Sequence, residues 1–345
     1  MQTVHDPLRR GLKLGFRETF YPLGGSLVVE SNRVAVLEAA RESFNRYPRV
    51  SDTPDYRIRL LVDPEFCEKP PWPSPVFRGH GEIFHIQVGR ESFAQADLGR
   101  RTAMGFVSAA LAGDTAFFRS MVLECLYFVM ATYSQHTYLH ASAVASEEKA
   151  IILAGPRCAG KSTLAYACGK QGLDVLSDDV VYIEQSGRGR RAPAPMRMWG
   201  KPWHLKLLPD AVRFFPELNS LEPRIQINNE FCLEVRLDDF LPGRAVVCAE
   251  PVAVFFLERG GVNAVHLETL MADAAYSRME ADLVLDSDKV MEQHRGVWRK
   301  LAALPAFRLI AAEDPHVTAR FLKDRIQGSG FRGQGSGTMN RTSGN

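Results

Sequence analysis

A glycine-rich run that ends in lysine and serine is the segment of this 345-residue sequence best suited to chemistry. Residues 155–162 read Gly-Pro-Arg-Cys-Ala-Gly-Lys-Ser and fit the pattern G-x-x-x-x-G-K-[ST] of phosphate-binding loops. In that pattern the glycines let backbone N–H groups point at phosphate oxygens, and the N-terminus of the next helix adds a partial positive charge. A tight turn without a ligand is the alternative. The buried strand predicted before the run and the helix predicted after it favour a phosphate site.

The pattern gives the loop residues separate expected functions. Lys161 is expected to reach the β- and γ-phosphates, and the Ser162 hydroxyl to ligate Mg²⁺. The residues expected to bind the nucleotide are Gly155, Pro156, Arg157, Cys158, Ala159, Gly160, Lys161, Ser162 and Thr163. The sequence therefore predicts a nucleoside triphosphate and Mg²⁺ as the bound cofactors.

Two adjacent carboxylates, Asp178 and Asp179, follow the predicted helix. A nucleotide site needs a carboxylate that holds Mg²⁺, and a kinase also needs one near the acceptor hydroxyl to take its proton. The pair could supply both. Because only 16 residues separate Ser162 from Asp178, we expect the acids on the strand after the helix, as a neighbour of the strand that precedes the loop. Taken alone, the pair would be interpreted as a turn with two solvated acids.

His140 is a third candidate, within the apolar run Leu139-His140-Ala141-Ser142-Ala143-Val144. A single histidine in an apolar strand is more often a core residue with its hydrogen bonds satisfied. Its strand comes just before the strand that precedes the loop, so His140 could orient or tune the acids, since small shifts move histidine across neutral pH.

The elements that must position these residues are predicted from hydrophobic periodicity. Strands are expected over Tyr138–Ala145 and Ala150–Ala154, and a helix over Lys161–Gln171 that stops at Gly172. Further elements are expected at Leu173–Ser177, Val180–Glu184, Pro251–Glu258, Met271–Lys300, Phe307–Ala311 and Val317–Ile326. This alternation of strands and helices predicts an α/β fold.

Three regions are expected along the chain. Residues 1–100 form a mixed α+β accessory region, in which Ser31 and Asn32 cap a helix that runs to Phe44. Residues 101–326 form the domain with the phosphate loop, beginning with a long Phe-, Met- and Leu-rich helix. Residues 327–345 are rich in Gly and Ser, lack apolar periodicity and are expected to be disordered. Other strands of the accessory region are expected at Ser26–Glu30, Arg57–Val62 and Ile83–Val88.

The composition excludes several classes of protein. The formal net charge is +2, with 46% hydrophobic residues, as in ordinary soluble domains. No global positive field would hold the chain to nucleic acid. We find no signal peptide and no apolar run near the roughly 20 residues of a membrane span, so neither a membrane nor a nucleic acid is an expected partner. The six cysteines lack zinc-site spacing and are expected to be reduced, mostly buried thiols of a cytoplasmic protein.

Taken together, the segments "LHASAV", "AIILAGPRCAGKSTLAYACGKQGLDVLSDDVVYIE" and "RFFPEL" resemble the HPr kinase/phosphorylase superfamily, specifically its HPr-kinase-related branch. The resemblance is strongest over residues 138–220 and extends to about 325. It implies a P-loop kinase core of the HPr kinase and phosphoenolpyruvate-carboxykinase type. It also implies ATP- and Mg²⁺-dependent phosphorylation of a hydroxyl, typically a serine on a protein or peptide. A homo-oligomer is compatible with this reading.

The resemblance also implies roles for single residues. Lys161 matches the phosphate-binding lysine and Ser162 the hydroxyl linked to Mg²⁺. Asp178 matches the acid that accepts the proton, Asp179 the acid linked to the metal, and His140 the active-site histidine. The catalytic residues expected on this basis are Asp178, Asp179, His140 and Lys161, and the metal ligands are Ser162 and Asp179.

The sequence departs from the family pattern in two places. Arg157 and Cys158 stand where the family loop has Ser-Gly, so Cys158 must hold a conformation open to a non-glycine residue. The E-I-R-G-x-G signature is absent, which argues against reverse phosphorolysis and against HPr as the acceptor. Two alternatives therefore stay open: a nucleotide-binding interaction protein without phosphoryl transfer, and a kinase of a small molecule such as free serine. For a motion-coupled P-loop NTPase, the sequence offers no evident arginine finger.

Overall fold

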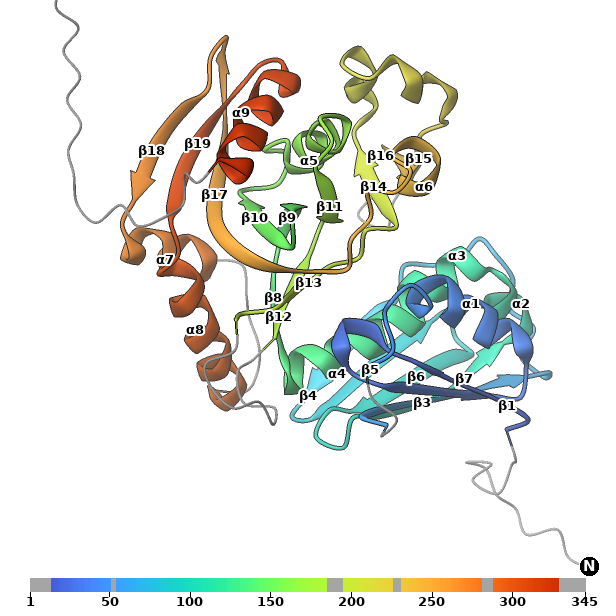
Figure 1. Cartoon of the computed structure of the whole chain (residues 1–345). Coiled ribbons are helices and arrows are strands. Elements are labelled where there is room, and N and C mark those ends of the chain that lie inside the picture. The colour runs from blue at the N-terminus through green and yellow to red at the C-terminus, as the bar shows by residue number, and fades with distance from the viewer. Residues whose placement is uncertain (1–13, 51–53, 185–194, 226–230, 281–287, 329–345) are drawn as a thin grey trace, which may run out of the picture. The chain divides into compact units, whose positions relative to one another are not determined.

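The computed structural model describes residues 14–50, 54–184, 195–225, 231–280 and 288–328, and it divides into two compact units (Figure 1). One unit comprises Met1–His136 with Val284–Glu292, and the other comprises Thr137–Leu283 with Gln293–Asn345. Both combine helices with sheets, so the predicted mixed α/β class is confirmed. The tail predicted to be disordered, residues 327–345, lies outside the described residues from 329 onward.

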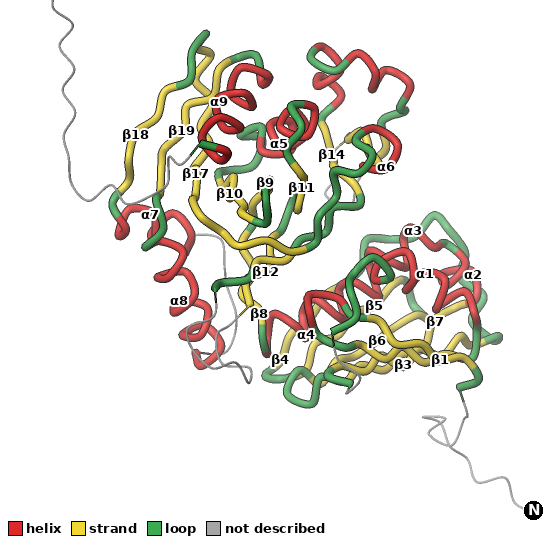
Figure 2. The backbone as a smooth tube through the Cα atoms, in the orientation of Figure 1, coloured by secondary structure: helices red, strands yellow, loops and turns green. Residues whose placement is uncertain are grey.

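The first unit contains a seven-stranded sheet in the order β1-β2-β3-β7-β6-β5-β4 within the described residues. Its strands are β1 (Phe16–Phe20), β2 (Leu27–Ser31), β3 (Tyr56–Asp63), β4 (Val76–His80), β5 (Ile83–Val88), β6 (Ser92–Asp97) and β7 (Thr102–Ser108). Its helical segments are η1 (Pro22–Gly24), α1 (Val34–Phe44), α2 (Ala109–Gly113), α3 (Thr115–Phe118), η2 (Arg119–Leu123) and α4 (Glu124–Ser134). The helices cover one face of this sheet (Figure 2).

An aromatic core holds the helices of the first unit to its sheet. The rings of Phe44 on α1 and Tyr127 on α4 meet edge to face at 5.5 Å, and Tyr56 on β3 meets Tyr127 at 5.2 Å. Edge-to-face geometry is favoured because the positive ring edge faces the negative ring surface. The helix α1 ends at Phe44 as predicted, but its N-cap is Arg33 without a side-chain cap. The Asn32 amide bonds to Val62 of β3 instead.

The long apolar helix predicted after residue 113 is present as α3, η2 and α4, with a π-helical turn in the middle. Its stretch Thr115–Ser134 is, by length and composition, apolar enough to cross a membrane, and half of its most apolar window is buried within the protein. That burial, against β3 and β6 of the sheet, is also typical of a core helix in a folded domain.

The boundary between the units lies farther along the chain than the sequence predicted. Residues 100 and 101 lie in the turn of the β6–β7 hairpin, inside the first sheet. The helix α4 also packs on that sheet, and the compact units divide at 136/137. Because β7 pairs with both β3 and β6, a boundary at 100/101 would cut a continuous ladder.

The second unit is built on a larger mixed sheet, with the path β11-β9-β10-β17-β13-β12-β8 and with β18 and β19 continuing from β17. Its strands are β8 (His136–Leu139), β9 (Ala141–Ser146), β10 (Lys149–Ala154), β11 (Asp174–Ser177), β12 (Val181–Glu184), β13 (Met198–Trp199), β17 (Cys248–Val262), β18 (His266–Leu270) and β19 (Ala306–Ala312). A smaller sheet contains β14 (His204–Leu207), β16 (Phe231–Arg236) and β15 (Arg224–Ile225) in that order.

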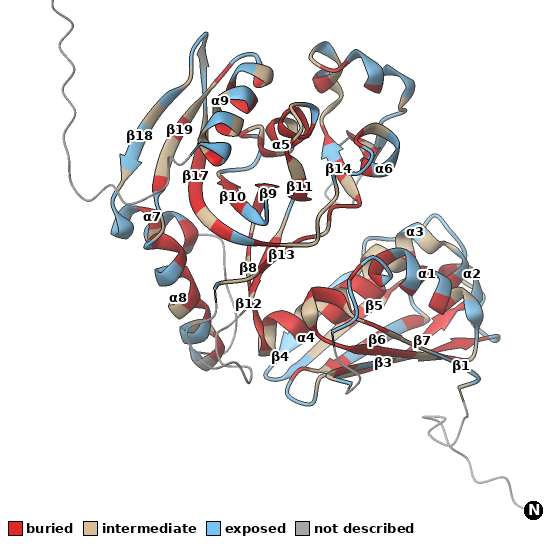
Figure 3. Ribbon diagram, viewed as in Figure 1, coloured by how far each residue is buried: buried red, intermediate tan, exposed pale blue. Residues whose placement is uncertain are grey.

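Two helices, α5 (Lys161–Lys170) and α9 (Pro315–Gln327), lie side by side over β9 and β10 (Figures 1 and 2). The remaining helical segments are η3 (Pro209–Arg213), η4 (Pro216–Ser220), α6 (Leu237–Phe240), α7 (Ala272–Glu280) and α8 (Asp288–Ala302). Ile151 and Leu153 of β10 and the buried residues 164–168 of α5 belong to one hydrophobic cluster (Figure 3). That cluster fixes the ends of both elements, between which the glycine-rich loop runs.

Two predictions about the sheet are wrong. The strand expected over Tyr138–Ala145 is broken at His140. The first part, β8, pairs with β12, whereas the second part, β9, pairs with β10 and β11. The strand that precedes the acids, β11, is not a neighbour of β10, since β9 lies between them and runs antiparallel to both. The parallel neighbour of β10 is β17, which the sequence predicted as an apolar interior strand.

Candidate functional site

The glycine-rich loop links β10 to α5, as the sequence predicted, and its backbone explains the glycines. Gly160 is the N-cap of α5 with φ +96°, a left-handed conformation that glycine adopts without strain. Gly155 has φ +146°, and a Cβ added there would lie 2.7 Å from the backbone oxygen of Leu257 on β17. Any larger residue at 155 would therefore push the loop away from the sheet.

Cys158 adopts φ +62° without being a glycine. Left-handed conformations of this kind are uncommon for residues with a Cβ, at a cost of roughly 1 kcal/mol. The Cys158 side chain is exposed and lines the cavity over the loop, in contrast to the mostly buried thiols predicted from the sequence. Among the six cysteines, Cys168 and Cys232 are buried, Cys125 and Cys248 are partly buried, and Cys67 is exposed like Cys158.

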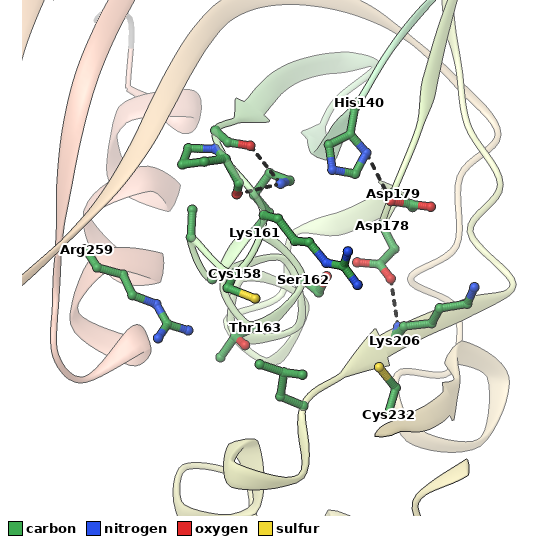
Figure 4. A pocket seen from close by; sticks show the side chains of 16 residues that line it. His140, Cys158, Lys161, Ser162, Thr163, Asp178, Asp179, Lys206, Cys232 and Arg259 are labelled. Carbon is green, nitrogen blue, oxygen red and sulfur yellow. Dashed lines mark hydrogen bonds and ion pairs between the residues drawn. The ribbon is translucent and has the colours of Figure 1, made fainter. Parts of the chain in front are cut away.

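A cavity of about 420 Å³ lies over the loop, and all the residues that the sequence singled out line it. Its lining includes the whole of Gly155–Thr163, together with His140, Asp178 and Asp179 (Figure 4). His140 comes from the break between β8 and β9, and the two acids from the turn between β11 and β12. Three separate segments of the second unit thus meet at one end of its sheet.

Lys161 is buried, with 7% of its surface exposed, and its ammonium group bends back over the loop. Its Nζ donates to the carbonyl oxygens of Gly155 at 2.8 Å and Pro156 at 3.1 Å. This places a cation within the curl of backbone where the motif expects phosphate oxygens.

Asp178 is a buried carboxylate, 6% exposed. Its Oδ2 accepts a hydrogen bond from the backbone N–H of Lys206 at 2.7 Å, while its Oδ1 is buried without a hydrogen-bond partner among the described residues. Burial raises the pKa of Asp178 to about 6, and the nearby Ser162 hydroxyl and the Lys206 N–H oppose that rise. A buried carboxylate oxygen without a partner is costly, which is typical of a site that binds a cation or a proton donor.

Asp179 has the opposite environment. Its side chain is 63% exposed, and its Oδ1 lies 3.1 Å from Nδ1 of His140. The hydrogen bond from His140 lowers the pKa of Asp179, with further help from the charges of Lys206 and Lys201. Asp179 therefore stays ionised, with its carboxylate exposed and held by His140.

Four cavity residues were not predicted as site residues from the sequence: Lys206, Leu208, Cys232 and Arg259. Lys206 and Cys232 are brought there by the β14–β16–β15 sheet, whose strands carry no recognisable motif. Arg259 lies within β17, shortly after the apolar run that ends at Leu257, and its place in the cavity could not be predicted because the pairing of β17 with β10 was not predicted. Arg259 lies on the side of α5 opposite Asp178 and Lys206 (Figure 4).

Comparison with known proteins adds little to this geometry. No family model matches the chain, and no curated protein matches its sequence. Among solved structures, the chain is similar to the Hpr(Ser) kinase/phosphatase from Coxiella burnetii, with 9% sequence identity and a TM-score of 0.30, over 55% of this chain and 91% of that one. Because this similarity is low, the site is interpreted from its own residues.

Proposed function

We propose that the protein is an ATP- and Mg²⁺-dependent kinase that phosphorylates a hydroxyl group, a serine of a protein or peptide. The observation that carries the proposal is the single cavity that joins a Gly-x-x-x-x-Gly-Lys-Ser loop to a buried acid and a His–Asp pair. Phosphoryl transfer needs positioning and charge neutralisation more than covalent catalysis, and these groups supply both.

The same residues support a P-loop kinase core of the HPr-kinase-like type for the second unit. The support is the order of parts along the chain: a histidine before the loop strand, the loop and its helix, and then the acid pair, all reaching one cavity. An unrelated turn would not bring these parts together.

The residues around Ser162 fit a bound Mg²⁺. Oxygen ligands suit this ion, and Asp178 offers a buried carboxylate oxygen without a partner beside the Ser162 hydroxyl. When bound, Mg²⁺ would neutralise charge on the phosphates. This geometry favours Asp178 as the acid linked to the metal, the reverse of the assignment implied by the family resemblance.

The exposed pair of His140 and Asp179 would then accept the proton of the acceptor hydroxyl. As the acceptor oxygen forms its bond to the γ-phosphorus and the bond to the β-phosphate oxygen breaks, the hydroxyl proton passes to Asp179. His140 holds one carboxylate oxygen of Asp179 and keeps the group ionised before transfer. The acceptor approaches from the open side, where Asp179 is exposed.

The kinase is tested by incubating the chain with γ-labelled ATP, Mg²⁺ and serine-containing peptides, followed by mass spectrometry of the products. Phosphoserine on a peptide is the expected result, and Lys161→Ala should abolish it. A Lys161→Ala variant with normal transfer would remove the loop from the mechanism. Label on free serine instead would assign a small-molecule kinase.

The division between the acids is tested by two isosteric variants. Asp179→Asn should keep Mg²⁺-dependent nucleotide binding and lower transfer by roughly 10²–10⁴-fold. Asp178→Asn should weaken the Mg²⁺ dependence of nucleotide binding. If the two variants show each other's behaviour, the assignment implied by the resemblance is correct and ours is wrong.

A second function, nucleotide binding without transfer, is favoured by one observation. Cys158 holds a left-handed conformation in the loop where glycine would be unstrained. ATP binding that depends on Lys161, with neither ADP nor phosphorylated product formed, would establish this second function.

A further inference from the structure

A second cavity of about 320 Å³ adjoins the phosphate loop in the second unit. It shares four residues with the first cavity, Ala159, Gly160, Thr163 and Arg259. The two cavities therefore meet over the first turn of α5. The size of the second cavity lies within the range of about 300–1,000 Å³ typical of small-molecule sites.

The lining of the second cavity differs from that of the first. Its floor contains buried apolar groups, including Leu164, Ala211, Leu257 and Pro315. Phe214 forms part of the wall, with the guanidinium of Arg213 over its ring at 4.4 Å. An apolar floor with a few polar groups at its edge is the usual lining for a flat organic ligand.

Phe214 is held in place from two directions. Its carbonyl oxygen lies 3.3 Å from Nε2 of His316 on α9. The next residue, Phe215, is buried and packs edge to face on Tyr166 of α5 at 4.7 Å. The segment "RFFPEL" thus builds the wall of this cavity and fastens it to α5 and α9, so the wall is formed without a ligand.

The direction of a bound triphosphate follows from the residues at the two ends of the first cavity, the acids at one end and Arg259 at the other. The γ-phosphate must lie near Lys161, Asp178 and Asp179 for transfer. The acids lie on one side of α5, and Arg259 lies on the other side, where the second cavity begins (Figure 4). The nucleoside must therefore leave the loop past Thr163, toward the second cavity.

We infer that the second cavity binds the nucleoside half of the triphosphate and that the base is a purine carrying an amino group. This rests on the proposed function. A purine presents the larger flat face for Phe214, Leu257 and the arginines to cover. The exposed carboxylates of Asp210 and Glu313 at the edge accept hydrogen bonds from an amino group and disfavour a second phosphate group there.

The test compares dissociation constants of the full chain for Mg·ATP and for Mg·tripolyphosphate, measured by calorimetry. ATP should bind at least tenfold more tightly, because only ATP fills the second cavity. Phe214→Ala should remove most of that difference while tripolyphosphate affinity stays within twofold. Phe231→Ala is the matched control, since Phe231 is 55% exposed and lines neither cavity.

Asp210→Asn, at an exposed position, serves as a second variant that leaves the core intact. It should lower the preference for ATP over ITP, a purine nucleotide without the amino group, by severalfold without changing tripolyphosphate binding. Equal affinity for ATP and tripolyphosphate, or wild-type ATP affinity in both variants, would overturn the inference and leave the phosphate site standing. Failure of both ligands to bind would overturn the proposed function as well.

Discussion

Asp178 and Asp179 are neighbours in the sequence but differ in what the protein does to their charge. Asp178 is buried against the backbone of Lys206, so its ionised form is penalised. Asp179 faces solvent and His140, so its ionised form is stabilised. Two titratable groups whose pKa values are separated in this way are typical of catalytic sites.

The burial of Asp178 predicts a pH-dependent stability. Because its folded-state pKa is about 6 and an unfolded aspartate titrates near 4, the folded state binds the proton more tightly. The penalty is absent below pH of about 4, grows as pH rises to about 6 and is complete above it. In the absence of Mg²⁺ and nucleotide, Asp178→Asn should therefore raise the free energy of unfolding at pH 7.5 by on the order of 2 kcal/mol.

Urea unfolding of both proteins at pH 4 and pH 7.5 measures this effect, and the gain should shrink toward zero at pH 4. Asp179→Asn is the matched control. It removes the carboxylate charge that His140 stabilises more than burial penalises it, so it should not stabilise the protein at either pH. An equal gain for both variants would show that burial of Asp178 is not the cause.

Cys158 predicts a second effect at the residue scale. A β-branched side chain tolerates φ +62° worse than cysteine does, because its extra γ-group crowds the backbone. Cys158→Val should lower the free energy of unfolding by roughly 1 kcal/mol and weaken nucleotide binding. Cys158→Gly should bind nucleotide at least as tightly as wild type, and weaker binding by the glycine variant would contradict this account.

At the scale of elements, the turn that carries Asp178 and Asp179 is held in place by a close approach between β11 and Gly200, the residue after β13. Gly200 donates its N–H to Val247 at 3.0 Å, and a Cβ added to Gly200 would collide with the carbonyl oxygen of Leu176. Leu176 is two residues before Asp178. The position of the buried acid therefore depends on a contact that only glycine allows.

Gly200→Ala should destabilise the protein by roughly 2–4 kcal/mol and reduce transfer more than ATP binding. Thermal unfolding and steady-state kinetics measure the two effects. Gly296→Ala is the matched control: Gly296 lies within α8 with nothing near its added Cβ, so alanine should stabilise the helix by roughly 0.5–1 kcal/mol. Wild-type stability in the Gly200 variant would show that the strands separate without cost.

The elements around the loop could be predicted because their signals are local. The apolar run of β10, the motif and the helix end at Gly172 each lie within about ten residues, and the structure has β10 and α5 where they were expected. Sheet order could not be predicted in the same way. The strand β9 lies between β10 and β11 because of pairing between distant segments, and hydrophobic periodicity gives no information about such pairing.

The same distinction separates the site residues that were expected from those that were missed. Lys161 and Ser162 belong to a motif with fixed spacing, and the acids follow it closely. Lys206 and Arg259 reach the cavity from strands about 40 to 100 residues farther along the chain. Their positions in the cavity depend on strand register. Lys206 lies opposite Glu234 in the smaller sheet, and Ile151 opposite Ala253 sets the register of β17, which carries Arg259.

At the scale of the whole molecule, a near-neutral chain conceals a strongly charged cavity. Four basic side chains, Arg157, Lys161, Lys206 and Arg259, line it with only two carboxylates, whereas the whole chain carries +2. Local concentration of charge is sufficient for phosphate binding, since interactions within a cavity are screened less than those at an open surface.

Nucleotide binding should therefore stabilise the second unit and leave the first unit unchanged. At 100 times its dissociation constant, Mg·ATP should stabilise the folded second unit by about 2.7 kcal/mol. Hydrogen exchange should slow in residues 153–165 and in the 204–215 segment, with peptides from residues 16–108 unchanged. Lys161→Ala should remove the protection, and protection centred on the first unit would place the nucleotide elsewhere.

The contact between Gly155 and β17 has a consequence for how the two cavities communicate. Leu257 lines the second cavity, and its carbonyl oxygen is the atom that would meet a Cβ at Gly155. Leu257 therefore connects the lining of the second cavity to the backbone of the phosphate loop. A base that displaces Leu257 in the second cavity should alter the free energy of phosphate binding at the loop, and thermodynamic reciprocity requires the two effects to be equal. Phosphate affinity and base affinity should then be non-additive, and a larger side chain at 257 should change their coupling as well as each one.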